Sequence, residues 1–169
     1  MMYKTIFLLL IVFVAQDDPL PPPWTKLEPQ GAGFSVFMPG KPVETIDQRP
    51  TFTLHSFSVT MGRGTYVASY SDYAREIRLD PGTALTSNRD KFNKGLKATL
   101  LTSREITRDG HTGLEFTSET PAANVKSQLF LIGNRMYQTA TFVFKDVDET
   151  RNVDRFFESF KLKPYVIVP

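Results

Sequence analysis

Two neighbouring segments near the C-terminal end of the chain constrain the fold most, because each carries apolar residues on both of its faces. They are residues 124–132 and 136–144, and the pair Gly133-Asn134 predicts a tight turn between them. The apolar residues are Val125, Leu129, Leu131, Ala140, Phe142 and Phe144 on one face, and Phe130, Ile132, Tyr137 and Val143 on the other. A sheet that is apolar on both faces has to be covered on both.

Two amphipathic segments predict helices that would provide this cover. The first follows Asp80-Pro81-Gly82, with Thr83 as its expected N-cap and with three large apolar residues on one side, Leu85, Phe92 and Leu96. The second covers about residues 148–160 and has an apolar stripe of Val153, Phe156, Phe157 and Phe160. Asp146 and Glu149 have the spacing of a capping box at its start.

The remaining chain is rich in strand signals. Strands are expected over residues 33–38, 43–46, 51–60, 65–73, 100–107 and 112–118, and the first four are spaced as a run of hairpins. The apolar parity slips between Phe52/Leu54 and Phe57/Val59, which predicts a β-bulge near His55 or Ser56. The predicted fold class is therefore α+β, with an antiparallel β-sheet of about six to eight strands flanked by two helices.

The N-terminal segment is expected to lie outside this fold. Lys4 precedes a run of apolar residues that is too short to cross a bilayer, which is the layout of a secretory signal peptide over residues 1–15. Residues 16–23 contain three consecutive prolines and predict an extended linker, so that residues 24–169 form a single domain. A buried N-terminal helix and an uncleaved membrane anchor are the alternatives.

Composition excludes several classes of site. The chain of 169 residues has no cysteine, so it has neither disulfides, a thiolate metal site nor a cysteine nucleophile. The net charge is +2, and loss of residues 1–15 would remove only Lys4, so a general nucleic-acid binder is not expected. No membrane span is predicted once the signal peptide is cleaved.

Several stretches resemble exported bacterial proteins of unknown function whose fold is similar to that of PsbP, the extrinsic subunit of photosystem II. The stretches are Trp24 with residues 33–42, then residues 70–73, 111–116, 133–137 and 156–162. The resemblance implies a PsbP-like fold for most of the mature chain. It implies neither a catalytic pattern nor a photosynthetic role.

Catalytic and metal-binding patterns are weak throughout. The chain has two histidines, His55 and His111, and both are more readily explained as hydrogen-bonded strand or turn residues than as metal ligands. No Gly-x-Ser-x-Gly motif occurs, residues 146–149 lack the rest of a calcium loop, and residues 31–33 lack the third glycine of a dinucleotide loop. We predict no catalytic residue, no cofactor and no metal site.

The most suggestive cluster lies at the end of the fourth strand and in the loop that follows it. We take the candidate partner or ligand surface to consist of Tyr66, Tyr70, Asp72, Tyr73, Arg75 and His111. The alternative is that Tyr66 and Tyr70 are half-buried sheet residues.

Three function classes follow, in decreasing order of expectation. The first is an exported, periplasmic or extracellular, non-enzymatic binding or accessory domain of the cell envelope, with an unidentified protein or small ligand as partner. The second is a small-molecule or metal carrier with a pocket between helix and sheet. The third is an enzyme with an unrecognised site.

Overall fold

The computed structural model describes residues 23–163. The predicted signal peptide and nearly all of the predicted linker lie outside these residues. The elements in chain order are β1 (Thr25–Leu27), β2 (Phe34–Met38), β3 (Val43–Gln48), β4 (Phe52–Met61), β5 (Gly64–Tyr73), α1 (Pro81–Leu96), β6 (Thr99–Arg108), β7 (His111–Glu119), β8 (Ala123–Ile132), β9 (Arg135–Phe144), α2 (Thr150–Ser159) and β10 (Lys161–Leu162).

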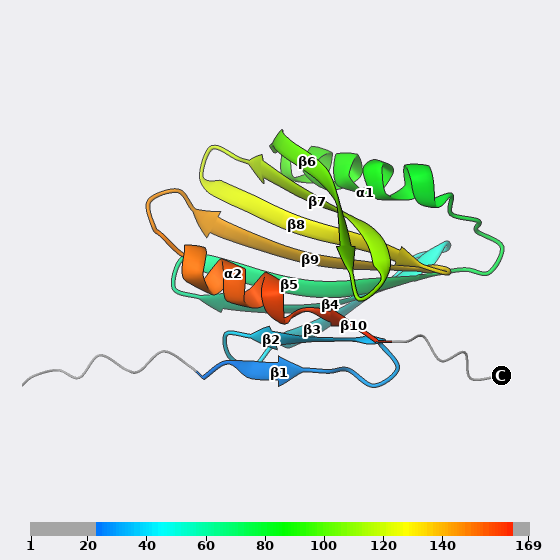
Figure 1. Cartoon of the computed structure of the whole chain (residues 1–169), viewed down its shortest axis with the longest axis horizontal. Helices are drawn as coiled ribbons and strands as arrows, with labels where there is room; N and C mark the ends of the chain where they lie inside the picture. Colours follow the sequence, from blue (N-terminus) through cyan, green and yellow to red (C-terminus); the bar gives the residue numbers. More distant parts are fainter. Residues whose placement is uncertain (1–22, 164–169) are drawn as a thin grey trace, which may run out of the picture.

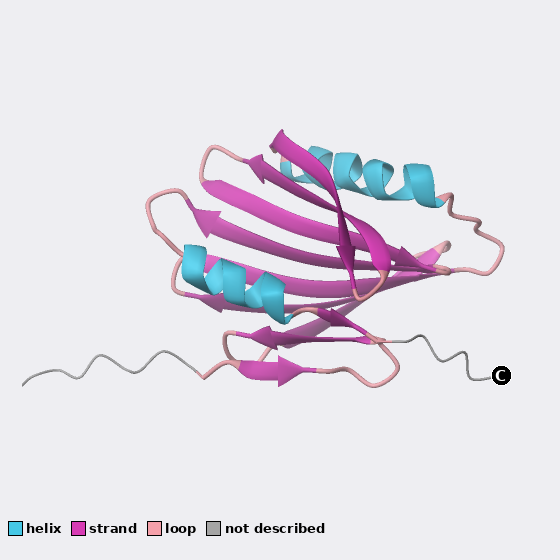
Figure 2. Ribbon diagram, in the orientation of Figure 1, coloured by secondary structure: helices cyan, strands magenta, loops and turns pink. Residues whose placement is uncertain are grey.

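The strands form two antiparallel sheets (Figures 1 and 2). The large sheet has seven strands in the order β3-β4-β5-β9-β8-β7-β6, and the small sheet has three in the order β1-β2-β10. This architecture confirms the predicted α+β class with an antiparallel sheet and two helices.

Both faces of the large sheet are covered over its centre, as the apolar pattern of residues 124–144 predicts. Helix α1 packs over β7 and β8 on one face, where it buries Phe116, Leu129 and Met136. Helix α2 and the small sheet cover the other face. The core on that side is aromatic and contains Phe34, Tyr66, Phe130, Tyr137, Phe156, Phe157 and Phe160.

The small sheet corrects the prediction that the first four strands are consecutive hairpins. Strand β2 pairs with β1 and β10, whereas β3 pairs with β4 in the other sheet. The turn at Pro39-Gly40 separates them, and Gly40 has φ +113°, which directs the chain away from β2. Neither β1 nor β10 was predicted.

The predicted bulge in β4 is wrong. All residues of β4 pair in unbroken register with β5, so Phe52 and Leu54 face one side of the sheet while Phe57 and Val59 face the other. The apolar parity slips because Phe57 packs in the aromatic core and Phe52 packs on Tyr73 across the sheet's other face. The irregularity lies instead in β6, between Leu100 and Thr102.

Both predicted helix caps are also wrong in detail. Asp80, not Thr83, is the N-cap of α1: its Oδ1 accepts a hydrogen bond from the Gly82 amide at 3.2 Å, and Thr83 donates its hydroxyl to Oδ2. In α2 the N-cap residue Glu149 makes no capping bond, and the Thr150 amide donates to Asp148 Oδ1 at 3.0 Å. In both cases the carboxylate just before the helix reaches the free amides first.

Candidate functional site

The structure divides the six predicted surface residues among different environments. Tyr66 is completely buried against Trp24 and Phe156, so its side chain offers no contact surface. Its hydroxyl donates to Glu149 Oε2 at 3.5 Å, and burial together with that carboxylate raises the pKa of Tyr66.

Tyr70 and Asp72 are brought together by a residue that the sequence did not single out, Arg135. The guanidinium donates to both Asp72 oxygens, with Nη2–Oδ2 at 2.8 Å, and lies 4.7 Å from the Tyr70 ring centroid. Burial alone would lower the pKa of Arg135, but the Asp72 carboxylate outweighs burial and raises it. His55 stacks on the same tyrosine at 4.6 Å.

Arg135 also ties this corner to the small sheet. Its Nη1 donates to the carbonyls of Gly31 and Ala32, at 2.6 and 3.0 Å, in the loop that leads into β2. The Asp72–Arg135 pair therefore has a structural role that accounts for its position. No local sequence signal places Arg135 beside Asp72, because the pairing of β5 with β9 joins segments that are 63 residues apart.

The other predicted residues are separated from this pair. Tyr73 is half-buried and packs on Phe52 and on the core beneath α1. Arg75 is exposed in the loop before α1. His111 begins β7, and β8 and β9 lie between β7 and the strand of Asp72. The predicted surface remains a prediction for Asp72, Tyr73 and Arg75, and His111 does not join it.

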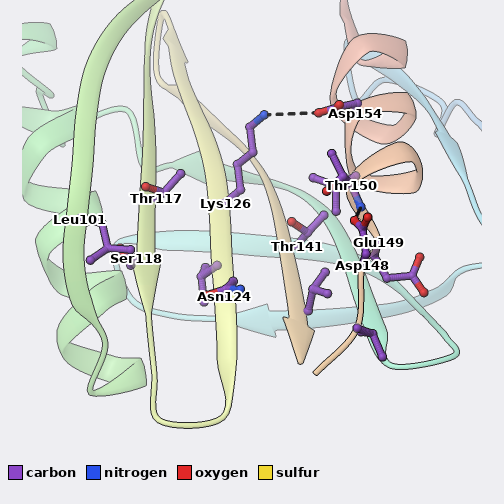
Figure 3. Close-up of a pocket in the computed structure, with 14 residues that line it drawn as sticks. Leu101, Thr117, Ser118, Asn124, Lys126, Thr141, Asp148, Glu149, Thr150 and Asp154 are labelled. Carbon is purple, nitrogen blue, oxygen red and sulfur yellow. Dashed lines mark hydrogen bonds and ion pairs between the residues drawn. The ribbon is translucent and has the colours of Figure 1, made fainter. Parts of the chain in front are cut away.

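A different feature has the form of a ligand site. A cavity of about 390 Å³, which we call the α2 cleft, lies between the start of α2 and the face of the large sheet (Figure 3). Its lining consists of Leu101, Thr117, Ser118, Asn124, Val125, Lys126, Thr141, Val143, Val147, Asp148, Glu149, Thr150, Val153 and Asp154. This volume lies within the usual range for small-molecule sites, about 300–1,000 Å³.

The cleft exists because α2 crosses only part of this sheet face. Strands β6 and β7 contribute two polar residues on this side, Thr102 and Thr117, which share a hydrogen bond of 2.7 Å between their hydroxyls. At the rim, Leu101 and the Asp154 side chain are more than half exposed. The apolar residues inside come from β8 and β9, from the loop before α2 and from α2 itself.

Two hydroxyls in the lining of the cleft make no hydrogen bond with any residue between 23 and 163, those of Ser118 and Thr141, and both residues are 1% exposed. Ser118 lies in one cross-strand row with Val125 and Phe142, and Phe142 packs on Phe92 of α1, so the Thr141 hydroxyl is the one on the α2 side. Figure 3 shows its side chain between β8 and the start of α2. Buried hydroxyls are normally hydrogen-bonded, so this group is available to a ligand.

Lys126 closes one end of the cleft and also has unused donors. Its Nζ lies 3.9 Å from Asp154 Oδ1, the contact dashed in Figure 3, and 3.9 Å from Glu115 Oε2. Both distances exceed that of a hydrogen bond. Glu115 is satisfied by others: burial alone would raise the pKa of Glu115, but hydrogen bonds from Gln128 and Arg104 outweigh burial and lower it.

Within the described part of the chain, no group of three or more His, Asp or Glu side chains is placed to hold a metal ion. Across the same residues, no helix has both the length and the apolar character needed to cross a membrane.

Comparison with known proteins was informative only for the fold. No protein-family model matches the sequence, and no curated protein matches it. The solution structure of cyanobacterial PsbP (CyanoP) from Synechocystis sp. PCC 6803 superposes with a TM-score of 0.60, covering 88% of this chain and 98% of that one. The fold is PsbP-like.

The PsbP-like fold confirms the resemblance drawn from the sequence. Identity to the cyanobacterial protein is 10%, so the likeness concerns the fold and carries no activity or ligand with it. A crystal structure from Bacteroides thetaiotaomicron has 14% identity, covers 82% of this chain and 48% of that one, and has a TM-score of 0.34, which is too low to bear on the fold.

Proposed function

We propose that this protein is a non-enzymatic binding domain of the bacterial cell envelope and that the α2 cleft is its ligand site. The observation that carries the proposal is the cleft itself, of about 390 Å³, with the buried and unpartnered Thr141 hydroxyl inside it. A concave site that combines apolar walls with a few polar groups is the usual form of a small-molecule site.

The described histidines support a binding role over a catalytic one. His55 Nδ1 lies 3.1 Å from Glu44 Oε1, and its ring is stacked on Tyr70. His111 lies on β7, and three strands of the sheet separate β7 from the strand of His55. Neither lines the α2 cleft, so the cleft holds no imidazole base beside its hydroxyls.

The placement in the envelope rests on the sequence of residues 1–15. We expect the protein to be recovered from the envelope or periplasmic fraction of its own cells, with a mature N-terminus close to residue 16 by mass spectrometry. Recovery of the intact chain in the cytoplasm would contradict this part of the proposal.

Filling the cleft with a large side chain tests whether it is the ligand site. The full-length protein would be incubated with a small-molecule extract of the envelope, washed by ultrafiltration and analysed by mass spectrometry, in parallel with Asn124→Trp. We expect a compound that the unmodified protein retains and the variant does not, because an indole at the exposed Asn124 occupies the cleft. The matched control is Thr86→Trp, on the outer surface of α1 on the other side of the sheet. Retention of nothing, or equal retention by Asn124→Trp, would contradict the ligand site.

A further inference from the structure

We propose that the α2 cleft binds a primary ammonium group carried on an aliphatic stem, from either a free alkylamine or the lysine side chain of a partner. This inference rests on the proposed function and names the chemical class of the ligand. It follows from the charge of the cleft, the unpartnered hydroxyl, and the shape and chemistry of the walls.

The charge of the cleft is opposite to that of the chain. Its lining contains three carboxylates, Asp148, Glu149 and Asp154, and one ammonium, Lys126, in a chain whose net charge is +2. Acidic residues at the start of a helix are commonly explained by the helix dipole alone. Here they also cancel the positive end of α2, so the cleft attracts a cation and repels an anion.

Thr141 gives an independent reason to expect a polar group in the ligand, because its hydroxyl can both donate and accept a hydrogen bond. Its hydroxyl is nearly inaccessible to solvent, faces the cleft and has no partner among residues 23–163. A ligand N–H group would satisfy it. An ammonium ion supplies three such donors, and Asp154, whose carboxylate makes no hydrogen bond within residues 23–163, is the acidic residue of the lining that remains free to accept one.

The side chains that line the cleft indicate what carries the ammonium group of the ligand. Five aliphatic residues line the cleft, Leu101, Val125, Val143, Val147 and Val153, and its described lining contains no aromatic ring. Quaternary ammonium ions are typically held by aromatic rings, which this cleft does not offer. A primary ammonium ion on an alkyl stem matches both the carboxylates and the aliphatic walls.

The Lys126 ammonium group competes with a cationic ligand for the acidic groups of the cleft. Its ammonium lies 3.9 Å from Asp154 and 4.9 Å from the Phe157 ring centroid, so it already contributes positive charge at one end of the cleft. An incoming ammonium ion is repelled by it. Removing this charge while keeping the length of the side chain should strengthen binding.

The test uses probes of one size and different charge with the full-length protein, followed by nuclear magnetic resonance titration of backbone amides. The probes are pentylammonium, pentanol, pentanoate and pentyltrimethylammonium. We expect pentylammonium alone to shift the amides of Thr141, Lys126 and Thr150, with a dissociation constant roughly in the millimolar range, and to bind more weakly as salt rises.

A second arm separates the two sources of the ammonium group. An unstructured peptide with one internal lysine is compared with pentylammonium. Tighter binding of the peptide identifies a lysine side chain as the ligand, and binding of pentylammonium alone identifies a free amine.

Three variants with matched controls test whether pentylammonium binding depends on Thr141, Asp154 and Lys126. We expect Thr141→Val to weaken pentylammonium binding about tenfold, and Asp154→Asn about threefold. Lys126→Met should tighten binding about threefold, a change that a loss of folding would not produce. The controls are Thr139→Val, whose hydroxyl is also buried and unpartnered on the same strand but does not line the cleft, and Asp90→Asn on α1. Neither should change the affinity.

The outcomes distinguish this inference from the proposed function. Binding of pentanoate or pentanol at the cleft in preference to pentylammonium would overturn the ligand class and leave the site in place. Retention of an envelope compound without any binding of pentylammonium or of the lysine peptide would do the same. If no probe binds and no compound is retained, both proposals fail together. Equal loss of binding in Thr141→Val and Thr139→Val would also overturn the inference.

Discussion

At the scale of single residues, Arg135 joins parts of the molecule that are far apart in sequence. Its guanidinium contacts the Asp72 carboxylate, the Tyr70 ring and the carbonyls of Gly31 and Ala32. The Arg135 side chain is 12% exposed, so a replacement that cannot donate leaves Asp72 and both carbonyls without this partner.

We therefore expect Arg135→Met to lower the free energy of unfolding by about 3 kcal/mol, measured by urea denaturation. The control is Arg63→Met, because Arg63 pairs with Asp146 on the surface, where both side chains are at least half exposed. That change should cost less than about 1 kcal/mol. Similar losses in the two variants would show that the Arg135 network contributes no more than a surface pair.

Some residues of this cluster can be identified from the sequence, and Arg135 cannot. Tyr70 and Asp72 were recognisable because they stand together at a strand end. Arg135 was not, because its partner Asp72 lies 63 residues away in the chain. The Thr141 hydroxyl was equally invisible, since only the packing of α2 shows that nothing satisfies it.

At the scale of the elements, the sequence located both helices but not the groups that begin them. The Asp80 side chain accepts from the Gly82 amide and from the Thr83 hydroxyl, so two nearby donors depend on one carboxylate. Helix α1 carries no acidic residue in its first turn that would replace it.

Asp80→Ala should therefore destabilise the protein by about 1 kcal/mol, measured as the shift in the urea midpoint at constant slope. Thr83→Ala is the informative comparison, because Thr83 was the cap expected from the sequence and only donates to Asp80 in the structure. Its cost should be clearly smaller. A larger loss for Thr83→Ala would mean that the sequence-based assignment of the cap was correct.

At the scale of the whole molecule, the small sheet and α2 are joined to the large sheet by phenylalanine rings in contact. The Phe160 ring lies 5.7 Å from that of Phe34 and 6.0 Å from that of Phe130. Phe130 occupies the space above Gly113, where a Cβ would lie 2.4 Å from its ring and 2.5 Å from the Leu129 carbonyl oxygen. The layers therefore fit only while residue 113 has no side chain.

We expect Gly113→Ala to destabilise the protein by about 3 kcal/mol or more, because the new methyl group forces Phe130 out of its position in the core. Gly95→Ala is the matched control in α1, where a Cβ would meet no atom within 4 Å. It should raise stability by about 0.5–1 kcal/mol. The two variants are compared by thermal and urea unfolding, and a neutral Gly113→Ala would contradict the tight packing of these layers.

Features that depend on neighbouring residues could be predicted from the sequence. Period-two alternation located the long strands, apolar stripes located both helices, and Asp109-Gly110 and Gly133-Asn134 marked turns that the structure contains. The apolar residues on both faces of β8 and β9 predicted a sheet covered on both sides, because exposing either face would be unfavourable.

Features that depend on residues far apart in the chain became visible in the tertiary structure. The small sheet brings Phe34 beside Leu162, and no local pattern marks a strand as short as Lys161–Leu162. The α2 cleft likewise arises from where α2 crosses the sheet. Strand pairing and side-chain packing between residues more than a hundred positions apart depend on how the whole core assembles. Short strands contain too few alternating residues for this pairing to be predicted from the sequence.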